Sequence, residues 1–520
     1  MHLLHTRDEL RRWCLAPGAR SVPLHFVPTM GALHQGHLQL VRRAQEPVAG
    51  LGPRVLVSVF VNPLQFGAGE DFERYPRSAR QDERLAHAAG AHALFLPTPE
   101  ELFPGGVAQL TRLSPPEALQ QVLCGRTRPG HFDGVATVVA RLLGLIRPER
   151  LLLGEKDWQQ LVILRRLVAD LGLPVKVQGC ATVREPDGLA FSSRNRYLSA
   201  VERSRAAALP KALQAARQRA LGPGGHSVEG LAREVRSALE GADLEVEYLE
   251  LVEPHSLAPL PQLEGLGLLA AAVRCGGCRL IDHVVLMTRQ PLVAIDGPAG
   301  AGKSTVTRAF AARLGLVYLD TGAMYRALTW WVLQQQVDPG DGEAITPLLN
   351  GLDLQLATAA SGEQRVAING HDVTEAIRSP EVTGAVSRVA AHGSVRQALT
   401  RQQQAMGERG GLVAEGRDIG TAVFPQADLK VFLTATVAER ARRRAHDLEL
   451  RGFPVPPLGE LEAQIAERDH ADASREVAPL RQAEDAVELV TDGMAIETVV
   501  ATLVELFRER VPEEAWPPQA

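Results

Sequence analysis

The sequence is poor in cysteine, aromatic residues and lysine, and the first two shortages argue against particular classes of protein. Five cysteines in 520 residues is an odd and low count, which argues against a disulfide framework. Aromatic residues make up 4% of the chain, which leaves few platforms for stacking nucleic-acid bases. Lysine occurs at only five positions, so each lysine is a candidate for a site that needs a compact ammonium group.

Basic charge and long apolar stretches are lacking as well. The formal net charge is −5, so no global basic field attracts nucleic acid. No uninterrupted apolar run reaches the roughly 18 residues that span a bilayer. Asp8, Glu9, Arg11 and Arg12 stand where a signal peptide would need an apolar stretch. We therefore expect a cytoplasmic protein with neither nucleic acid nor membrane as a partner.

The length and the element pattern predict several α/β domains. At about 150 residues per domain, 520 residues correspond to three or four. Up to about residue 185, strands and helices alternate, which predicts a parallel, Rossmann-like sheet covered by helices. The strands are expected at 22–28, 55–61, 93–96 and 150–153, and the helices at 36–44, 79–89, 135–146 and 159–171.

The pattern of apolar residues and chain-breaking residues changes after this domain. Glycines and a proline break the chain at 222–225, residues 244–252 alternate as a half-buried strand does, and 268–273 and 279–286 flank a Cys-Gly-Gly-Cys turn. We interpret 186–286 as a smaller α+β domain and the cysteine pair as a hairpin turn, not a zinc or redox site. A linker at 287–290 leads to a second α/β domain, 291–520, with strands at 292–295, 316–319, 412–414 and 430–433 and a loose tail at 513–520.

A phosphate-binding loop opens this last domain. Residues 297–304 match G-x-x-x-x-G-K-S/T, with a strand before and a helix after. The glycines Gly297, Gly300 and Gly302 let backbone N–H groups converge on phosphate oxygens at the helix N-terminus. In such a loop Lys303 neutralises the β- and γ-phosphates of ATP and Ser304 ligates Mg²⁺, with Thr305 beside it.

The motifs downstream narrow the acceptor of the phosphoryl group. They are Asp-Thr-Gly-Ala-Met-Tyr-Arg at 320–326, Ser-Arg-Val-Ala at 387–390, Glu-Gly-Arg-Asp at 415–418 and Arg-Asp at 468–469. In this succession the chain resembles bacterial cytidylate kinase over nearly all of 291–506. The resemblance implies phosphorylation of CMP or dCMP by ATP, with arginines of the lid, Arg468 and Arg475, reaching the phosphates. It implies that CMP is bound by Thr321, Tyr325, Arg326, Ser387, Arg396, Arg417 and Asp418. The cluster Arg440, Arg442, Arg443 and Arg444 is expected to be a charged helix face.

A second nucleotide site is predicted in the first half. His34 and His37 form an H-x-G-H motif between a strand and a helix, where Gly36 lets a phosphate approach the backbone. Polar segments follow other strands at 60–67, 154–160 and 191–195, where open α/β sheets bind ligands. Together with Tyr-Pro-Arg at 75–77 and His-Phe-Asp-Gly at 131–134, these motifs resemble pantothenate synthetase over about 1–286.

This resemblance implies a reaction in two steps. ATP and pantoate give pantoyl adenylate and pyrophosphate, and the amine of β-alanine then displaces AMP. It implies ATP binding by Met30, Gly31, His34, Gly36, His37, Gly154, Lys156, Asp157, Ser192, Ser193 and Arg194, with His34, His37 and Lys156 in catalytic roles. It implies pantoate binding by Gln65, Gln160 and Asn62, whose amides donate and accept without adding charge. Asp82 is the candidate Mg²⁺ ligand of this half.

Alternatives remain at this point. The second half fits another P-loop kinase, of the UMP/CMP or shikimate type, and the first half fits a different H-x-G-H transferase. One half could also survive only as a binding or oligomerisation module. A homodimer through the synthetase half is a further expectation. No intermediate passes between the two reactions, since one makes pantothenate and the other CDP.

Overall fold

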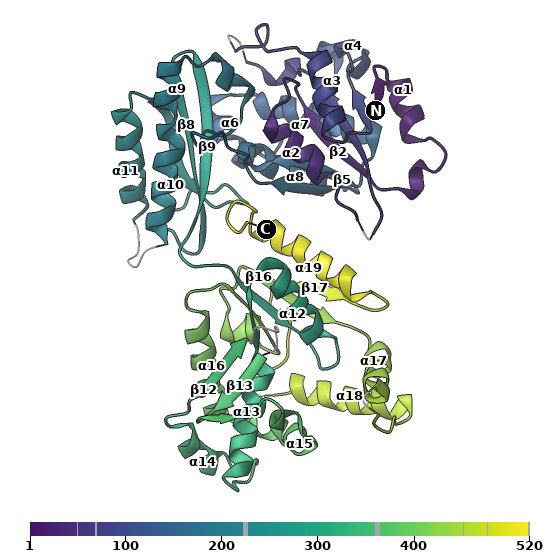
Figure 1. The fold of residues 1–520 in the computed structure, drawn as a ribbon, viewed down its shortest axis with the longest axis vertical. Coiled ribbons are helices and arrows are strands. Elements are labelled where there is room, and N and C mark those ends of the chain that lie inside the picture. The colour runs from purple at the N-terminus through teal and green to yellow at the C-terminus, as the bar shows by residue number, and fades with distance from the viewer. Residues whose placement is uncertain are drawn as a thin grey trace. The chain divides into compact units, whose positions relative to one another are not determined.

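The computed structural model describes residues 1–48, 50–67, 70–221, 227–358, 364–450, 452–475 and 477–517. The described chain forms two compact units, and Figure 1 labels many of their helices and strands. The first unit comprises Met1–Thr288 together with Pro512–Pro517, and the second contains the chain between them, Arg289–Val511. The glycine-rich break expected at 222–225 lies outside the described residues.

A six-stranded parallel sheet forms the centre of the first unit. Its order is β1-β4-β3-β2-β5-β6, with bounds His2–Leu4, Ala93–Phe95, Arg54–Val59, Leu24–Thr29, Arg150–Gly154 and Lys176–Cys180. The four inner strands are almost wholly buried because helices cover the sheet, as the continuous apolar runs predicted, while the edge strands β1 and β6 are partly exposed. The helices of this part are α1 (Arg7–Cys14), α2 (Gln35–Arg43), α3 (Ala79–Ala88), α4 (Pro99–Leu102), α5 (Glu117–Gln120), α6 (Leu123–Thr127), α7 (His131–Ile146) and α8 (Trp158–Asp170).

The rest of the first unit is an antiparallel sheet packed on helices. Strands β7 (Glu245–Val252), β8 (Leu266–Cys275) and β9 (Cys278–Met287) pair in sequence order. Their apolar faces share one core with helices α10 (Ala208–Ala220) and α11 (Val228–Gly241), which α9 (Ala200–Ala206) precedes. Cys275 and Cys278 lie opposite each other at the turn between the antiparallel strands β8 and β9, and both are free thiols. The predicted hairpin is thus confirmed.

The second unit is built on a five-stranded parallel sheet. Its order is β11-β15-β10-β16-β17, with bounds Val317–Asp320, Leu412–Gly416, Leu292–Asp296, Leu429–Thr434 and Val487–Val490. A small antiparallel sheet adds β12 (Leu354–Thr358), β13 (Gln364–Ile368) and β14 (His371–Asp372). The helices are α12 (Lys303–Leu314), α13 (Thr321–Gln334), α14 (Gly342–Ile345), α15 (Pro380–Val389), α16 (Gly393–Gly407), α17 (Val437–Leu450), α18 (Leu458–Ala473) and α19 (Ile496–Arg510). Both predicted parallel sheets are thus confirmed.

The prediction of a loose tail at 513–520 is wrong for the part that the structure describes. Pro512–Pro517 belongs to the first unit, although the second unit immediately precedes it in the chain. Glu513 is 8% exposed and Ala515 is 4% exposed, so the segment is packed and not solvated. Residues 518–520 lie outside the described residues. Among the described helices, none is both long and apolar enough to cross a bilayer.

Candidate active sites

The H-x-G-H segment lies between the end of β2 and the start of α2. Gly31 has φ +85°, and a Cβ there would approach Val59 Cγ1 to 2.8 Å, so this position requires glycine. The Asp82 carboxylate accepts the backbone N–H groups of Ala32 at 3.0 Å and Leu33 at 2.8 Å and is 1% exposed. Asp82 is buried and lines neither of the two cavities described below, so it does not fit the expected Mg²⁺ site, and we assign it no metal.

His34 and His37 lie together at the N-terminus of α2. Their ring centroids are 4.0 Å apart, and the ring of Phe191 stacks on His34 at 5.8 Å. Burial, together with the charge of Lys156, lowers the pKa of His34 to about 4. Burial and the neighbouring His34 lower the pKa of His37 to about 3. Both rings are therefore neutral at physiological pH.

The hydrogen bond between these residues assigns the tautomer of one ring. The backbone N–H of His34 donates to Nδ1 of His37 at 3.4 Å, so the proton of that neutral ring resides on Nε2. Nδ1 of His34 is buried and has no hydrogen-bond partner in the described part of the chain. Each ring thus keeps a nitrogen that can serve a bound ligand.

The two histidines open onto a cavity of about 230 Å³ that also touches most of the other predicted ATP residues. Lys156 and Asp157 form an ion pair at 3.3 Å in the turn after β5. Arg194 forms a two-pronged pair with Asp71 at 2.8 and 3.0 Å, and the hydroxyl oxygens of Ser193 and Tyr75 are 3.2 Å apart. The predicted residues that line this cavity are Met30, His34, Gly36, His37, Asn62, Gln65, Gly154, Lys156, Asp157, Gln160, Ser192, Ser193 and Arg194.

An adjoining cavity of about 110 Å³ is lined by two of the three predicted amides, Gln65 and Gln160, while Asn62 lines the larger cavity. Asn62, which is 1% exposed, donates to Gln65 Oε1 at 3.1 Å and to the carbonyl oxygen of Gly134 at 3.0 Å. Gln65 in turn donates to Met30 Sδ at 2.8 Å, while Gln160 lines both cavities. The close packing here requires glycine at position 134, because a Cβ there would lie 2.1 Å from the Leu64 carbonyl oxygen.

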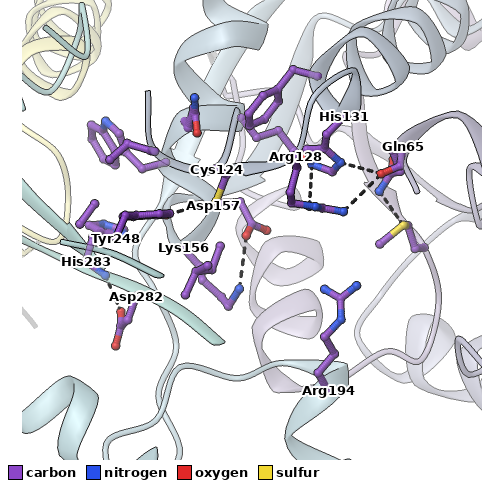
Figure 2. A pocket seen from close by; sticks show the side chains of 18 of the residues that line it. Gln65, Cys124, Arg128, His131, Lys156, Asp157, Arg194, Tyr248, Asp282 and His283 are labelled. Carbon is purple, nitrogen blue, oxygen red and sulfur yellow. Dashed lines mark hydrogen bonds and ion pairs between the residues drawn. The ribbon is translucent and has the colours of Figure 1, made fainter. Parts of the chain in front are cut away.

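Two basic side chains that the sequence did not assign a role line the smaller cavity. Figure 2 shows Arg128 and His131 turned toward Gln65. Arg128 donates to both oxygens of Glu70 at 2.6 Å, and Nδ1 of His131 lies 2.7 Å from the Gln65 carbonyl oxygen. His131 belongs to the His-Phe-Asp-Gly motif, which was a usable signal, whereas nothing local marked Arg128.

The predicted phosphate loop of the second unit has the expected backbone. Gly297, Gly300 and Gly302 have φ of +149°, +76° and +86°, and α12 begins at Lys303. The Lys303 ammonium donates to the carbonyl oxygens of Gly297 and Pro298, both at 2.8 Å. Burial, and next the charge of Arg417, lower the pKa of Lys303 to about 7.

The arginine cluster of α17 divides into two pairs. Arg440 is 3% exposed and donates to the Ala299 carbonyl oxygen at 3.1 Å and to Asp469 at 2.6 and 3.0 Å. Arg443 donates to the Ala301 carbonyl oxygen at 3.2 Å. The prediction of a charged helix face is therefore wrong for Arg440 and Arg443, which contact the backbone of the phosphate loop, while Arg442 and Arg444 are exposed.

A buried carboxylate joins the phosphate loop to the neighbouring strand. Glu415 at the end of β15 accepts the hydroxyls of Ser304 at 2.5 Å and Tyr318 at 2.7 Å. Its second oxygen is buried without a hydrogen-bond partner among the described residues, and its backbone carbonyl accepts from Thr321 at 2.6 Å. Thr305 is exposed in the first turn of α12.

Most of the remaining predicted kinase residues gather around two ion-pair systems. Arg396, 4% exposed, pairs with Asp418 at 2.5 Å and lies 5.7 Å from the Tyr325 ring. Asp472 accepts from Arg417 at 3.0 Å and also pairs with Arg475. Three predicted residues lie outside these two systems. Arg326 pairs with Asp320 at 3.1 Å, and Ser387 is exposed on α15. The Nε of Arg468 is buried without a hydrogen-bond partner in the described chain.

Family comparisons agree with this geometry in both units. Residues 2–285 match the model of the pantoate-beta-alanine ligase family, and residues 293–509 match that of the cytidylate kinase family. A pantothenate synthetase from Thermus thermophilus, known from its crystal structure, is 45% identical; the match covers 55% of this chain and 99% of that one, with a TM-score of 0.50. Both resemblances are confirmed.

Relatives also share the fusion of the two halves. A protein of Parasynechococcus marenigrum (strain WH8102) is 68% identical over 518 residues, which are 100% of each chain. One of Prochlorococcus marinus (strain MIT 9313) is 64% identical over 498 residues, 95% of this chain and 97% of the relative. Both are described as bifunctional pantoate ligase/cytidylate kinase. The chain therefore belongs to the family of bifunctional pantoate ligase/cytidylate kinases, and it is an enzyme with both activities.

Proposed function

We propose that each unit carries one of the two activities, with the ligase in 1–288 and the kinase in 289–511. The observation that carries this assignment is the presence of two phosphate-binding devices of different construction, one in each unit. The first is a pair of neutral imidazoles at the start of α2, and the second is a glycine-rich loop with a lysine at the start of α12. Each suits the anionic phosphates of its own ATP molecule.

In the ligase, the pantoate carboxylate attacks the α-phosphorus of ATP and pyrophosphate leaves. We assign His34, His37 and Lys156 to the phosphate oxygens, where N–H donors stabilise the charge that develops on the leaving group. Gln65 and Gln160 line the second cavity, and Asn62 donates a hydrogen bond to Gln65, which supports the assignment of the three amides to pantoate. The β-alanine amine then attacks the acyl carbon of the adenylate, its nitrogen loses a proton, and AMP leaves.

In the kinase, a phosphate oxygen of CMP attacks the γ-phosphorus of ATP and ADP leaves. Such a transfer depends mainly on positioning and on charge stabilisation. We assign Lys303, Arg468 and Arg475 to the transferred group and the Tyr325–Arg396–Asp418 set to CMP, with dCMP as the second substrate. The buried pair of Arg396 and Asp418 supports this assignment, because it keeps a guanidinium fixed beside an aromatic ring.

Mg²⁺ is part of the proposal for the kinase only. Ser304 would hold the ion, which would neutralise charge on the β- and γ-phosphates. The fit is supported by the Glu415 carboxylate, whose second oxygen has no hydrogen-bond partner among the described residues and offers a metal ligand beside the serine hydroxyl. We also propose a cytoplasmic location, testable by fractionation, and a dimer through the ligase unit, testable by light scattering.

Separate substitutions in the full-length chain test the assignment. Lys303→Ala is expected to abolish CMP phosphorylation and to leave pantoate-dependent AMP formation within about twofold, since the lysine is confined to one phosphate site. His37→Ala is expected to do the reverse. Loss of both activities from either change would contradict the assignment of one activity to each unit. Parallel assays with UMP and shikimate distinguish the kinase from the other P-loop kinases.

A further inference from the structure

The C-terminal segment Pro512–Pro517 completes the first unit of the chain. Its backbone N–H groups at Glu513 and Glu514 both donate to the Glu155 carboxylate, each at 3.2 Å. Glu155 is 2% exposed and lies 358 residues away from Glu513 in the sequence. It directly precedes Lys156 and Asp157, which line the nucleotide cavity.

The side chains of Glu513 and Glu514 accept hydrogen bonds from a second stretch of chain that lines the same cavity. Glu513 accepts the backbone N–H of Ala181 at 3.5 Å, and Glu514 accepts the Thr182 hydroxyl at 3.2 Å. Ala181, Thr182 and Val183 line the cavity that also contains the two histidines. The segment is therefore bonded to two separate stretches of chain that reach the nucleotide cavity, 154–157 and 181–183.

Buried ion pairs fix the segment in this place. Glu513 pairs with Arg43 at the end of α2, the helix whose N-terminus carries His37. Glu514 lies 3.1 Å from Arg184 and 3.1 Å from Nε2 of His283. Burial alone would raise the pKa of Glu514, but His283 and Arg184 lower it to about 2, so the carboxylate stays ionised.

We propose that Pro512–Pro517 is a positioning element of the ligase site, through which Glu513 and Glu514 hold the two nucleotide-lining stretches in place. The inference rests on the ligase activity proposed for the first unit. It makes the ligase depend on residues that lie beyond the kinase in the sequence. Synthesis of the whole chain, kinase included, then precedes completion of the ligase site.

The test compares full-length enzyme with a chain that stops after Val511. The truncated chain is expected to show a rise of about tenfold or more in the ligase KM for ATP, because small displacements of positioning groups are costly. The KM for β-alanine and the CMP kinase rate are expected to stay within about twofold. A synthetic peptide of residues 512–520, added in trans, should restore part of the loss.

Point variants keep the test valid should the truncated chain fail to fold. Glu513→Gln with Glu514→Gln retains the two backbone N–H donors and removes the ion pairs, so a smaller rise in KM for ATP is expected. Glu509→Ala, an exposed residue of α19, is the matched control and should leave both activities unchanged. An unchanged KM for ATP in the truncated chain, or a lower kcat with every KM unchanged, would overturn the proposal. Absence of ligase activity in the full-length enzyme would instead refute the proposed function.

Discussion

Gly134 offers a sharp test of how the pantoate side of the ligase site is built. A Cβ at this position would lie 2.1 Å from the carbonyl oxygen and 2.4 Å from the carbonyl carbon of Leu64. These are backbone atoms of the short helical turn Pro63–Gln65 (η2), so no side chain can rotate to relieve the overlap. Gly134→Ala must therefore push this turn away from α7.

The size of the effect follows from the contacts that the turn maintains. Normal contacts of a Cβ atom exceed about 3.4 Å, so the turn must move by about 1 Å, and overpacking of this kind costs about 1–3 kcal/mol of stability. The same movement strains the hydrogen bond from Asn62 to the Gly134 carbonyl and displaces Gln65. A displacement of about 1 Å in a positioning group costs up to about 100-fold in rate.

The assay is steady-state AMP formation with pantoate as the varied substrate. We expect kcat/KM for pantoate to fall by about tenfold to 100-fold in Gly134→Ala, with the CMP kinase unchanged. Gly144→Ala is the matched control, because Gly144 lies in the same helix with nothing within 4 Å of its Cβ position. If Gly134→Ala kept full activity with pantoate, the turn would not be positioning the substrate.

Three further predictions concern charge. Arg440→Ala should lower the kinase kcat/KM for ATP by about tenfold or more, because the Ala299 carbonyl oxygen loses its donor and Asp469 loses its partner. Arg442→Ala is the control, since the Arg442 side chain is 64% exposed. Equal kcat/KM values in the two variants would contradict a role of Arg440 in supporting the phosphate loop. The pKa of Lys303 is about 7 in the free protein, so the side chain is mostly uncharged at pH 8 and should take up about one proton when ATP binds. Calorimetry at pH 8 in two buffers should show this uptake in the unmodified enzyme but not in Lys303→Ala. A binding heat that does not depend on the buffer would refute this. The pKa of Glu514, about 2, lies below its usual 4.5, so ionised Glu514 stabilises the folded first unit above pH 4.5, and this stabilisation is lost as the pH falls toward 2. In Glu514→Gln, the free energy of unfolding of the first unit should therefore depend less on pH between 4.5 and 2.

Local sequence patterns were sufficient for most of the fold. Strands such as 55–61 and 292–295 are short apolar runs next to glycine or proline, and their burial in parallel sheets follows from that composition. The structure gives Arg54–Val59 and Leu292–Asp296, so only the ends differ. The phosphate loop and the H-x-G-H segment could also be located, because their chemistry requires glycine and a cation or imidazole at fixed spacing.

Contacts between distant segments explain what the sequence did not reveal. Arg440 looks like its neighbours in an arginine-rich helix, and only the fold places it, and not Arg442, under the phosphate loop. Asp82 resembles a metal ligand in a charged helix, yet the turn after β2 brings two N–H groups to its carboxylate. Periodicity marks the face on which a side chain lies but not which backbone groups meet it.

The C-terminal segment shows this limit most clearly. Val-Pro-Glu-Glu-Ala-Trp contains adjacent acidic residues and a proline, and such a composition is typical of solvated ends. Burying Glu513 and Glu514 is feasible only because Arg43, Arg184 and His283 come from three other segments to compensate their charge. Burial and then the charge of Glu514 raise the pKa of Glu155 to about 7, whereas the hydrogen bond from the backbone N–H of Glu514 acts in the opposite direction and favours the ionised carboxylate. Removing the segment would leave Glu155 next to the nucleotide site with neither amide partner, which is why we expect the loss to appear in ATP binding.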